Sequence, residues 1–248
     1  MSIFLKRKAK DVLDLLGYSL VSKKEFGNNG MADLMSILPK NTELTLLDIG
    51  ANLGQTTIEL ETFFPKSKIY SFEPDPDTFQ QLSKAIGSYS NIKAYNLGFG
   101  DYSGKIKMNI NKASGGNSIL SVSEKIGQYA HGAWTEKVGE GKIEIATIDS
   151  FCDNNQIYTI DLVKIDTQGY ELKILNGGEK TIVPARTKAV FVEVLFVELY
   201  QQQAYFIDIF SLLTQRGYKL VGFYNPFYKL EPPNFLLWCD ALFVSENA

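Results

Sequence analysis

Short β-branched and apolar runs alternate with amphipathic segments along most of this chain, beginning at residue 44. The apolar runs have the length of buried strands, and the segments between them carry apolar residues at helical spacing. We expect strands at 44–49, 68–72, 92–97, 162–165, 189–195, 219–223 and 241–244, and helices at 58–64, 78–86, 171–175 and 204–215. Strands that alternate with helices form parallel sheets through crossover connections, so the pattern predicts one α/β domain over residues 44–248.

Residues 101–160 interrupt this alternation. Two stretches of alternating residues, 105–110 and 142–148, flank a glycine-rich segment at 113–117 and a polar segment that runs through Trp134. Alternation favours strands, so the interruption predicts an inserted β-hairpin with a mobile loop between its arms.

Residues 1–43 form a separate N-terminal segment in this scheme. Its apolar residues are punctuated by basic ones, a pattern that indicates a basic amphipathic helix carrying Lys6, Arg7, Lys8 and Lys10. We favour a lid or docking helix; the alternative is contact with a membrane surface.

Composition excludes several classes of protein. The 25 basic and 28 acidic residues give a net charge of -3, so the chain lacks the positive field that collects nucleic acid. No apolar run approaches the ~18 residues of a membrane span, and the N-terminus does not resemble a signal peptide. Cys152 and Cys239 are far apart and lack a C-x-x-C partner, which favours reduced thiols in a cytoplasmic protein.

The first candidate motif is a glycine loop that follows the strand at 44–49. Asp48, Gly50, Ala51, Asn52 and Gly54 belong to the sequence DIGANLG. Gly50 allows a tight turn and Gly54 lets the next helix approach the sheet, so a ligand can lie against backbone amides at the helix N-terminus. The spacing is not that of a dinucleotide fingerprint, and an acid at the strand end favours a ligand with an ammonium group.

A carboxylate, Glu73, stands at the end of the next strand, in the sequence SFEP. An acid at that point of an α/β sheet accepts hydrogen bonds from the two hydroxyls of a ribose. A ligand with both a ribose and an amine is S-adenosylmethionine. A nicotinamide dinucleotide would bring a pyrophosphate that the first loop is not shaped to hold.

Two further acids end later strands. Asp166 follows the apolar run VKI, and Glu193 lies in FVEV on the neighbouring strand. The carboxyl ends of parallel strands meet at one edge, so Asp48, Glu73 and Asp166 should converge on one crevice and Glu193 should reach its rim. Buried acids are costly without a partner, so Asp166 and Glu193 should meet cations or hydroxyls, or titrate upward.

The combination DIGANLG, SFEPDP, NLGFGD, TIDSF, VKIDTQGYELKILNGG and FVEV resembles the FkbM family of class I S-adenosylmethionine-dependent methyltransferases over residues 44–195. The resemblance implies a Rossmann-like sheet of seven strands with an antiparallel last strand and helices on both faces. It also implies methyl transfer to a hydroxyl, commonly of a sugar or polyketide.

Carried onto this sequence, the resemblance implies roles for the individual motif residues. The glycine-loop residues would line the methionine end of the cofactor, Glu73 and Pro74 would hold the ribose, and Asn96 to Gly98 would flank the adenine. Gln168 stands where the family also uses glutamate, and we assign it no catalytic role.

The acceptor hydroxyl must lose a proton, and three solutions are open. His131 is the only histidine, lies in the inserted segment, and has the pKa of a general base. Alternatively, Asp166 and Glu193 hold Mg²⁺, which acidifies the hydroxyl. In the third, both acids bind cofactor or substrate directly.

The C-terminal part is rich in aromatic residues, and stacking on an acceptor is one role for Tyr224, Phe227 or Tyr228. We therefore predict an O-methyltransferase acting on a small-molecule or glycan acceptor. The alternatives are a nucleotide-binding module without catalysis and an NAD-dependent oxidoreductase.

Overall fold

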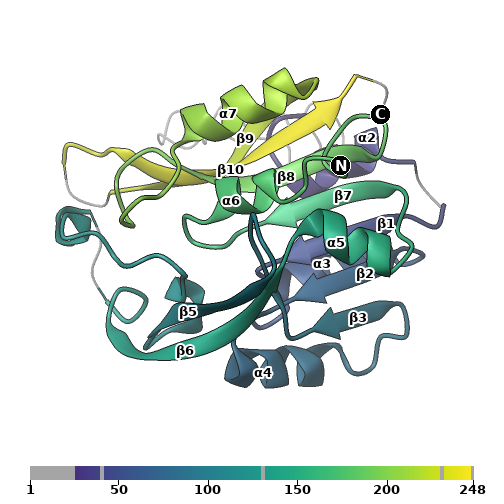
Figure 1. The fold of residues 1–248 in the computed structure, drawn as a ribbon. Coiled ribbons are helices and arrows are strands. Elements are labelled where there is room, and N and C mark those ends of the chain that lie inside the picture. Colours follow the sequence, from purple (N-terminus) through teal and green to yellow (C-terminus); the bar gives the residue numbers. More distant parts are fainter. Residues whose placement is uncertain (1–25, 40–41, 130–131, 230–231, 247–248) are drawn as a thin grey trace, which may run out of the picture.

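The computed structural model describes residues 26–39, 42–129, 132–229 and 232–246. These residues form a central sheet in the strand order β3-β2-β1-β7-β8-β10-β9 (Figure 1). The strands are β1 (Thr45–Ile49), β2 (Lys68–Phe72), β3 (Ile92–Tyr95), β7 (Ile160–Ile165), β8 (Thr187–Leu195), β9 (Tyr218–Tyr228) and β10 (Leu236–Ser245). Only β10 runs against its neighbours, β8 and β9, so the predicted Rossmann-like sheet of seven mostly parallel strands is confirmed.

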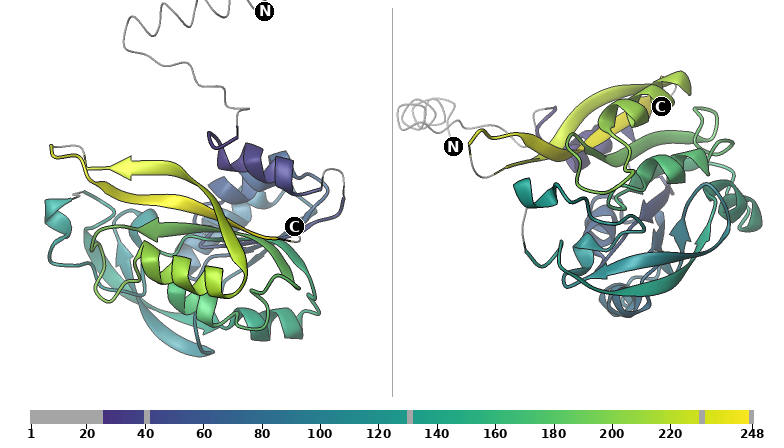
Figure 2. Two further views of the ribbon diagram at one scale, coloured as in Figure 1. Left: turned by 90° about the horizontal axis from the view of Figure 1, so that it is seen from above. Right: turned by 60° about the vertical axis from the view of Figure 1, so that its left-hand side comes forward.

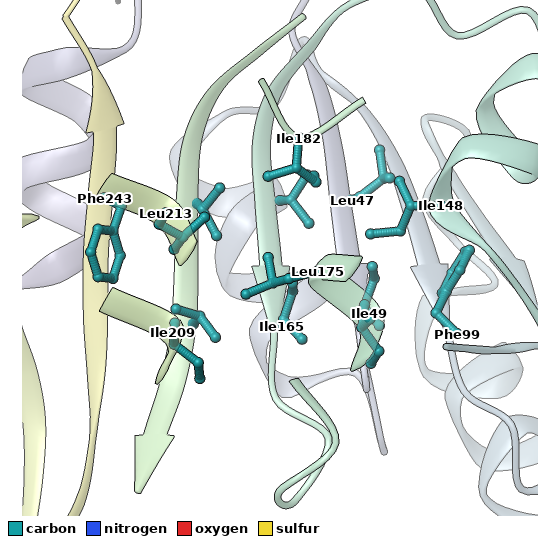
Figure 3. Packing of buried hydrophobic residues seen from close by; sticks show 14 of the residues in the cluster. Leu47, Ile49, Phe99, Ile148, Ile165, Leu175, Ile182, Ile209, Leu213 and Phe243 are labelled. Carbon is teal, nitrogen blue, oxygen red and sulfur yellow. The ribbon is translucent and has the colours of Figure 1, made fainter. Parts of the chain in front are cut away.

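Helices cover both faces of this sheet. On one face lie α2 (Gly30–Ile37), α3 (Gln55–Phe63) and α4 (Pro76–Ile86), and on the other lie α5 (Ile148–Asn154), α6 (Glu171–Asn176) and α7 (Phe206–Gln215). Figure 2 shows α2 and α7 on opposite sides of β9 and β10. The larger core lies under α5, α6 and α7, where leucine, isoleucine and phenylalanine side chains fill the space between helices and strands (Figure 3).

The register of β1 decides which of its side chains reach which layer. Successive strand residues point to opposite faces, so Leu47 and Ile49 join the core under α5 and α6. Leu46 and Asp48 point to the α3 side. Strands β7, β8 and β10 continue this register. The charged residues Asp48, Lys164, Glu193 and Asp240 therefore lie on the same face of the sheet.

A second sheet contains β4 (Gly98–Phe99), β5 (Gly104–Asn111) and β6 (Lys137–Ala146). β5 and β6 are antiparallel, which confirms the inserted hairpin. The loop between them is held against the main domain in its described part. Ser114 donates to Asn52 Oδ1 at 2.7 Å, and Ser118 donates to the backbone oxygen of Gln168 at 2.8 Å. The loop therefore lies over the carboxyl edge of the large sheet.

Helix α2 belongs to the packed domain although it precedes residue 44. Its N-terminus is capped by Asn29, whose side chain accepts from the amide of Ala32. Leu34 is fully buried, and Asp33 accepts hydrogen bonds from the amide of Gly27 at 2.7 Å and the hydroxyl of Tyr224 at 2.8 Å. The predicted basic helix at the N-terminus lies outside the described residues. No helix in the described part of the chain has the length and apolar character needed to cross a membrane.

Candidate active site

The turn from β1 to α3 is built on two glycines with positive φ. Gly50 has φ +80°, and a Cβ there would lie 1.8 Å from the backbone oxygen of Asp166. The end of β1 therefore touches the end of β7. Gly54 has φ +93° and caps α3, but its close neighbour is Leu82 of α4, 2.9 Å from an added Cβ. We predicted that Gly54 lets α3 approach the sheet; in the structure it lets α3 approach α4.

The amides of this turn are largely used within the protein. Those of Gly50 and Ala51 both donate to the backbone oxygen of Phe72, at 3.0 and 2.9 Å. The amide of Gly54 donates to the backbone oxygen of Ala51 at 2.8 Å. The amides of Gly50 and Ala51 therefore fix the turn against the end of β2, and binding of a ligand at the N-terminus of α3 stays a prediction.

Glu73 lies at the end of β2 and is only 6% exposed. Its two carboxylate oxygens accept from the amides of Asn52 at 3.0 Å and Asp75 at 2.9 Å. Burial raises the pKa of Glu73 to about 7, against the effect of these two hydrogen bonds. A carboxylate accepts about four hydrogen bonds, so capacity remains for two ligand hydroxyls.

A cavity with about 710 Å³ of empty space, its open mouth included, lies beside Glu73. Its polar lining includes Gly50, Asn52, Glu73, Asp166 and Gln168. Its apolar lining includes Pro74, Leu97, Gly98, Phe99, Met108 and Ile119. We call it the first cavity.

Several predicted residues stand behind the first cavity rather than on its wall. The side-chain amide of Asn96 donates to the backbone oxygens of Glu73 and Pro74, both at 2.9 Å, and so holds the turn after β2. Ala51 and Gly54 shape the turn after β1 as described.

Asp48 is fully buried, outside the lining of the first cavity. One oxygen accepts from the hydroxyl of Thr57 at 2.6 Å, and the other lies 3.5 Å from the ammonium of Lys164. The cation that this acid meets is therefore a lysine of the neighbouring strand. A contact between Asp48 and a ligand ammonium group stays a prediction.

Lys164 was missed in the sequence, although a lysine inside an apolar strand is itself a signal. Its ammonium lies 3.5 Å from Asp48 Oδ1 and 3.5 Å from Asp166 Oδ2. Burial alone would lower its pKa, but the neighbouring carboxylates, with Asp166 first and Asp48 second, outweigh burial and raise the pKa above its ordinary value. Lys164 thus stays charged and couples the two strand ends.

A second cavity lies on the other side of Gln168, with about 590 Å³ of empty space including its mouth. It is lined by Trp134, Gln168, Glu193, Leu195, Leu199 and Trp238. Gln168 and Gly115 line both cavities, so the two share a boundary. Glu193, predicted at the rim, is on this second wall and not on the first.

Gln168 forms the junction of the two cavities. Its side-chain amide donates to Asp166 Oδ1 at 2.9 Å and to Glu193 Oε2 at 3.1 Å, while its oxygen accepts from the hydroxyl of Tyr200 at 2.8 Å. Its φ of +58° is held by Glu171, which accepts from the amides on either side of it, at residues 167 and 169. We assigned Gln168 no catalytic role, and spacing alone does not reveal its position at this junction.

The surroundings of Glu193 favour the protonated form of its carboxyl group. Burial raises the pKa of Glu193 well above its ordinary value, and the negative charge of Asp166 raises it further. Asp240 pairs with Glu193 across β8 and β10, and burial raises its pKa to about 6. The two cavities are thus joined at a group of acids that compete for protons.

Residues 48–220 match the family model described as the methyltransferase FkbM domain. The chain belongs to the FkbM methyltransferase family. It is 26% identical over 184 residues to the 2-O-methyltransferase NoeI of Sinorhizobium fredii, covering 73% of this chain and 74% of that protein. It is 27% identical over 156 residues to the hexuronic acid methyltransferase AglP of Haloferax volcanii, covering 60% and 56%.

Solved methyltransferase structures are similar to this FkbM domain at low sequence identity. One is the precorrin-6y C5,15-methyltransferase of Geobacter metallireducens, with a TM-score of 0.48 and 12% identity, covering 90% of this chain and 95% of that one.

The structure does not support the predicted Mg²⁺ site at Asp166 and Glu193. In the described ranges, no group of three or more His, Cys, Asp or Glu side chains is placed to hold a metal ion. The side-chain amide of Gln168 occupies the position between the two carboxylates. His131 lies outside the described residues, so its role as a base stays a prediction.

The C-terminal aromatics divide between core and cavity. Tyr224 is buried, tilted against Phe191, and donates to Asp33, so it does not line the second cavity. Phe227 stacks on Trp238 with ring centroids 4.0 Å apart and an angle of 11° between the rings. Phe227 therefore packs on a ring that lines the second cavity and is not itself among the lining residues.

Proposed function

We propose that this chain transfers a methyl group from S-adenosylmethionine to a hydroxyl of a sugar, glycan or polyketide-type acceptor. The observation that carries the proposal is the shared boundary of the two cavities at Gln168, beside Asp166 and Glu193. Methyl transfer needs a donor and an acceptor on opposite sides of one point, and adjoining cavities supply that arrangement.

The residues of the first cavity fit S-adenosylmethionine. Glu73 has free lone pairs for the ribose hydroxyls, and the wall near Pro74, Leu97 and Phe99 is apolar enough for the adenine. Asp166 has a partly exposed side chain on the same wall and would hold the amino group. When bound, the cofactor supplies an electrophilic methyl group.

Glu193 is the proposed general base. It lies in the second cavity, and Gln168 donates to only one of its oxygens, Oε2. A raised pKa suits a carboxylate for removing a proton near neutral pH, because the strength of a base rises with its pKa. Gln168 fixes the orientation of this carboxylate and is a positioning residue.

The name of one relative supports oxygen as the methylated atom. The name of the Sinorhizobium protein specifies 2-O-methylation, and that of the Haloferax protein specifies a hexuronic acid. Both names are consistent with a sugar-type acceptor here.

A cytoplasmic location is part of the proposal. Cys152 and Cys239 are both buried free cysteines. Buried free thiols are typical of proteins in a reducing compartment.

Calorimetry with S-adenosylmethionine, S-adenosylhomocysteine and NAD, followed by a mass-shift screen against hydroxylated acceptors, tests the proposal. We expect binding of the first two ligands, no binding of NAD, and a product heavier by one methyl group. Binding of NAD alone would favour the oxidoreductase alternative. Cofactor binding without any methylated product would favour the binding module.

A further inference from the structure

The wall of the second cavity has an apolar part and a polar part, a division that methyl transfer does not by itself require. One part of its wall is indole and leucine, and the other part is a carboxylate and an amide. We propose that this cavity binds an uncharged, hydroxyl-bearing ring against the indoles and rejects acceptors that carry a carboxylate. The inference rests on the proposed function, because it identifies the class of acceptor.

The aromatic wall is formed by Trp134 of the inserted segment and Trp238 of β10. Their rings meet at 73° with centroids 5.6 Å apart, and Phe227 stacks on Trp238. Leu195 and Leu199 are buried beside them. The C–H face of a pyranose ring is apolar and slightly positive, so it packs well on the electron-rich face of an indole.

The polar part of the wall selects for hydroxyl donors. Glu193 offers an oxygen that accepts from a hydroxyl, and Gln168 is already committed to Asp166, Glu193 and Tyr200. Of the lining residues in the described part of the chain, none is a lysine, arginine or histidine. A carboxylate on the acceptor would therefore find no cationic partner among these residues.

The charges behind the wall add repulsion. Asp240 is the register partner of Glu193 on β10, and Asp166 directly follows β7, whose last residue, Ile165, pairs with Val192. In the described residues, the ion pairs of this acidic group involve one cation, Lys164, and it is shared between Asp48 and Asp166. Like charges in a poorly solvated site repel strongly, so an anionic acceptor is disfavoured.

Tryptophan fluorescence gives a direct readout of this cavity, because the chain has two tryptophans and both line it. We would titrate the protein, saturated with S-adenosylhomocysteine, with the methyl glycosides of glucose, galactose and mannose and with their matched uronic acids. We expect at least one neutral glycoside to change the fluorescence saturably, with its uronic acid at least about tenfold weaker. Sorbitol, which has hydroxyls but no ring, should have no effect.

Two variants separate recognition from folding. Trp238→Ala should abolish the response of Trp134 to the glycoside and Trp238→Phe should retain part of it, while both keep the calorimetric affinity for S-adenosylhomocysteine. Glu193→Gln should reduce the preference for the neutral glycoside over its uronic acid. Equal binding of the uronic acids, or no response to any glycoside while S-adenosylhomocysteine still binds, would overturn the inference. Failure to bind S-adenosylhomocysteine would instead contradict the proposed function.

Discussion

Gln168 donates a hydrogen bond to Glu193 Oε2 across 3.1 Å, and the same amide nitrogen donates to Asp166 Oδ1 across 2.9 Å. A neutral side chain thus separates two carboxylates that would otherwise repel each other. Tyr200, which is buried, donates to the oxygen of Gln168 and fixes which end of the amide faces the acids. The orientation of Glu193 therefore depends on a residue with no charge of its own.

Replacing that amide tests this dependence. Gln168→Glu removes the donor and adds a third acid, so the pKa of Glu193 should rise further and the pH–rate profile should move to higher pH. At pH 7 we expect a rate lower by about tenfold or more. Gln201→Glu, on an exposed residue, is the matched control and should leave the profile in place. An unchanged profile for Gln168→Glu would show that Glu193 is not the titrating base.

Glu73 should make cofactor binding depend on pH. Burial raises its pKa to about 7, and only the ionised form offers all its lone pairs to the ribose. Affinity for S-adenosylhomocysteine should therefore increase from about pH 6 to pH 8, by no more than about tenfold per pH unit. Calorimetry across this range is the measurement, and in Glu73→Gln the affinity should be weaker and nearly independent of pH. A steep dependence that persists in the variant would assign the titration to another group.

The pH should affect the stability of the fold through Glu73 in the opposite direction to its effect on cofactor affinity. Because the folded pKa of Glu73 lies above its ordinary value of 4.5, protonated Glu73 stabilises the fold. This contribution is complete below about pH 4.5 and is lost as the pH rises through about 7.

Gly50 should tolerate no side chain. A Cβ would lie 1.8 Å from the backbone oxygen of Asp166, and φ of +80° is unfavourable for alanine. Gly50→Ala should lower the free energy of unfolding by more than about 2 kcal/mol, because backbone and not a flexible side chain must move. Denaturant unfolding measures this, with Gly139→Ala as control, since an added Cβ at Gly139 meets no atom within 4 Å. Equal stability of the two variants would contradict the close approach of β1 and β7.

The hydrogen bond from Tyr224 to Asp33 should stabilise the docking of α2. Both residues are buried and the bond is 2.8 Å long, so Tyr224→Phe leaves a buried carboxylate with one donor fewer. We expect a loss of about 1 to 3 kcal/mol in the free energy of unfolding, with cofactor affinity unchanged. Tyr228→Phe alters an exposed residue of the same strand and should have no effect. A drop in cofactor affinity for Tyr224→Phe would indicate that α2 also shapes the first cavity.

Much of the fold follows from hydrophobic periodicity. The strand at Lys68–Phe72 has the predicted bounds, because a short apolar run between polar turns has few alternatives. Helix α5 was missed because it begins at Ile148, directly after β6, where the alternating pattern continues for two residues. Strands β9 and β10 are longer than predicted. The end of β9 is mostly exposed and carries no core pattern, whereas β10 begins at Leu236 with buried Leu237 and Cys239 alternating with partly exposed residues.

The site residues that were predicted are those that can be recognised at the end of a single strand. Glu73 and Asp166 line one cavity because parallel strands end at a common edge. Lys164 and Gln168 were missed because their importance lies in contacts between strands: one pairs with Asp48, and the other reaches Glu193. Such contacts depend on register and side-chain direction, which a single sequence does not specify.

Two hypotheses for the general base remain, Glu193 and His131. Glu193 lies on a strand in the second cavity, and rigid strands position groups more accurately than loops do. Glu193→Gln should therefore lower the rate by about 10² to 10⁴, the usual contribution of a positioned base, and should leave the affinity for S-adenosylhomocysteine intact. His131→Ala should lower the rate by less than about tenfold if this assignment is right. Measuring both single variants and the double variant at saturating cofactor distinguishes the hypotheses, because a large loss confined to His131→Ala would transfer the role of base from Glu193 to the inserted loop.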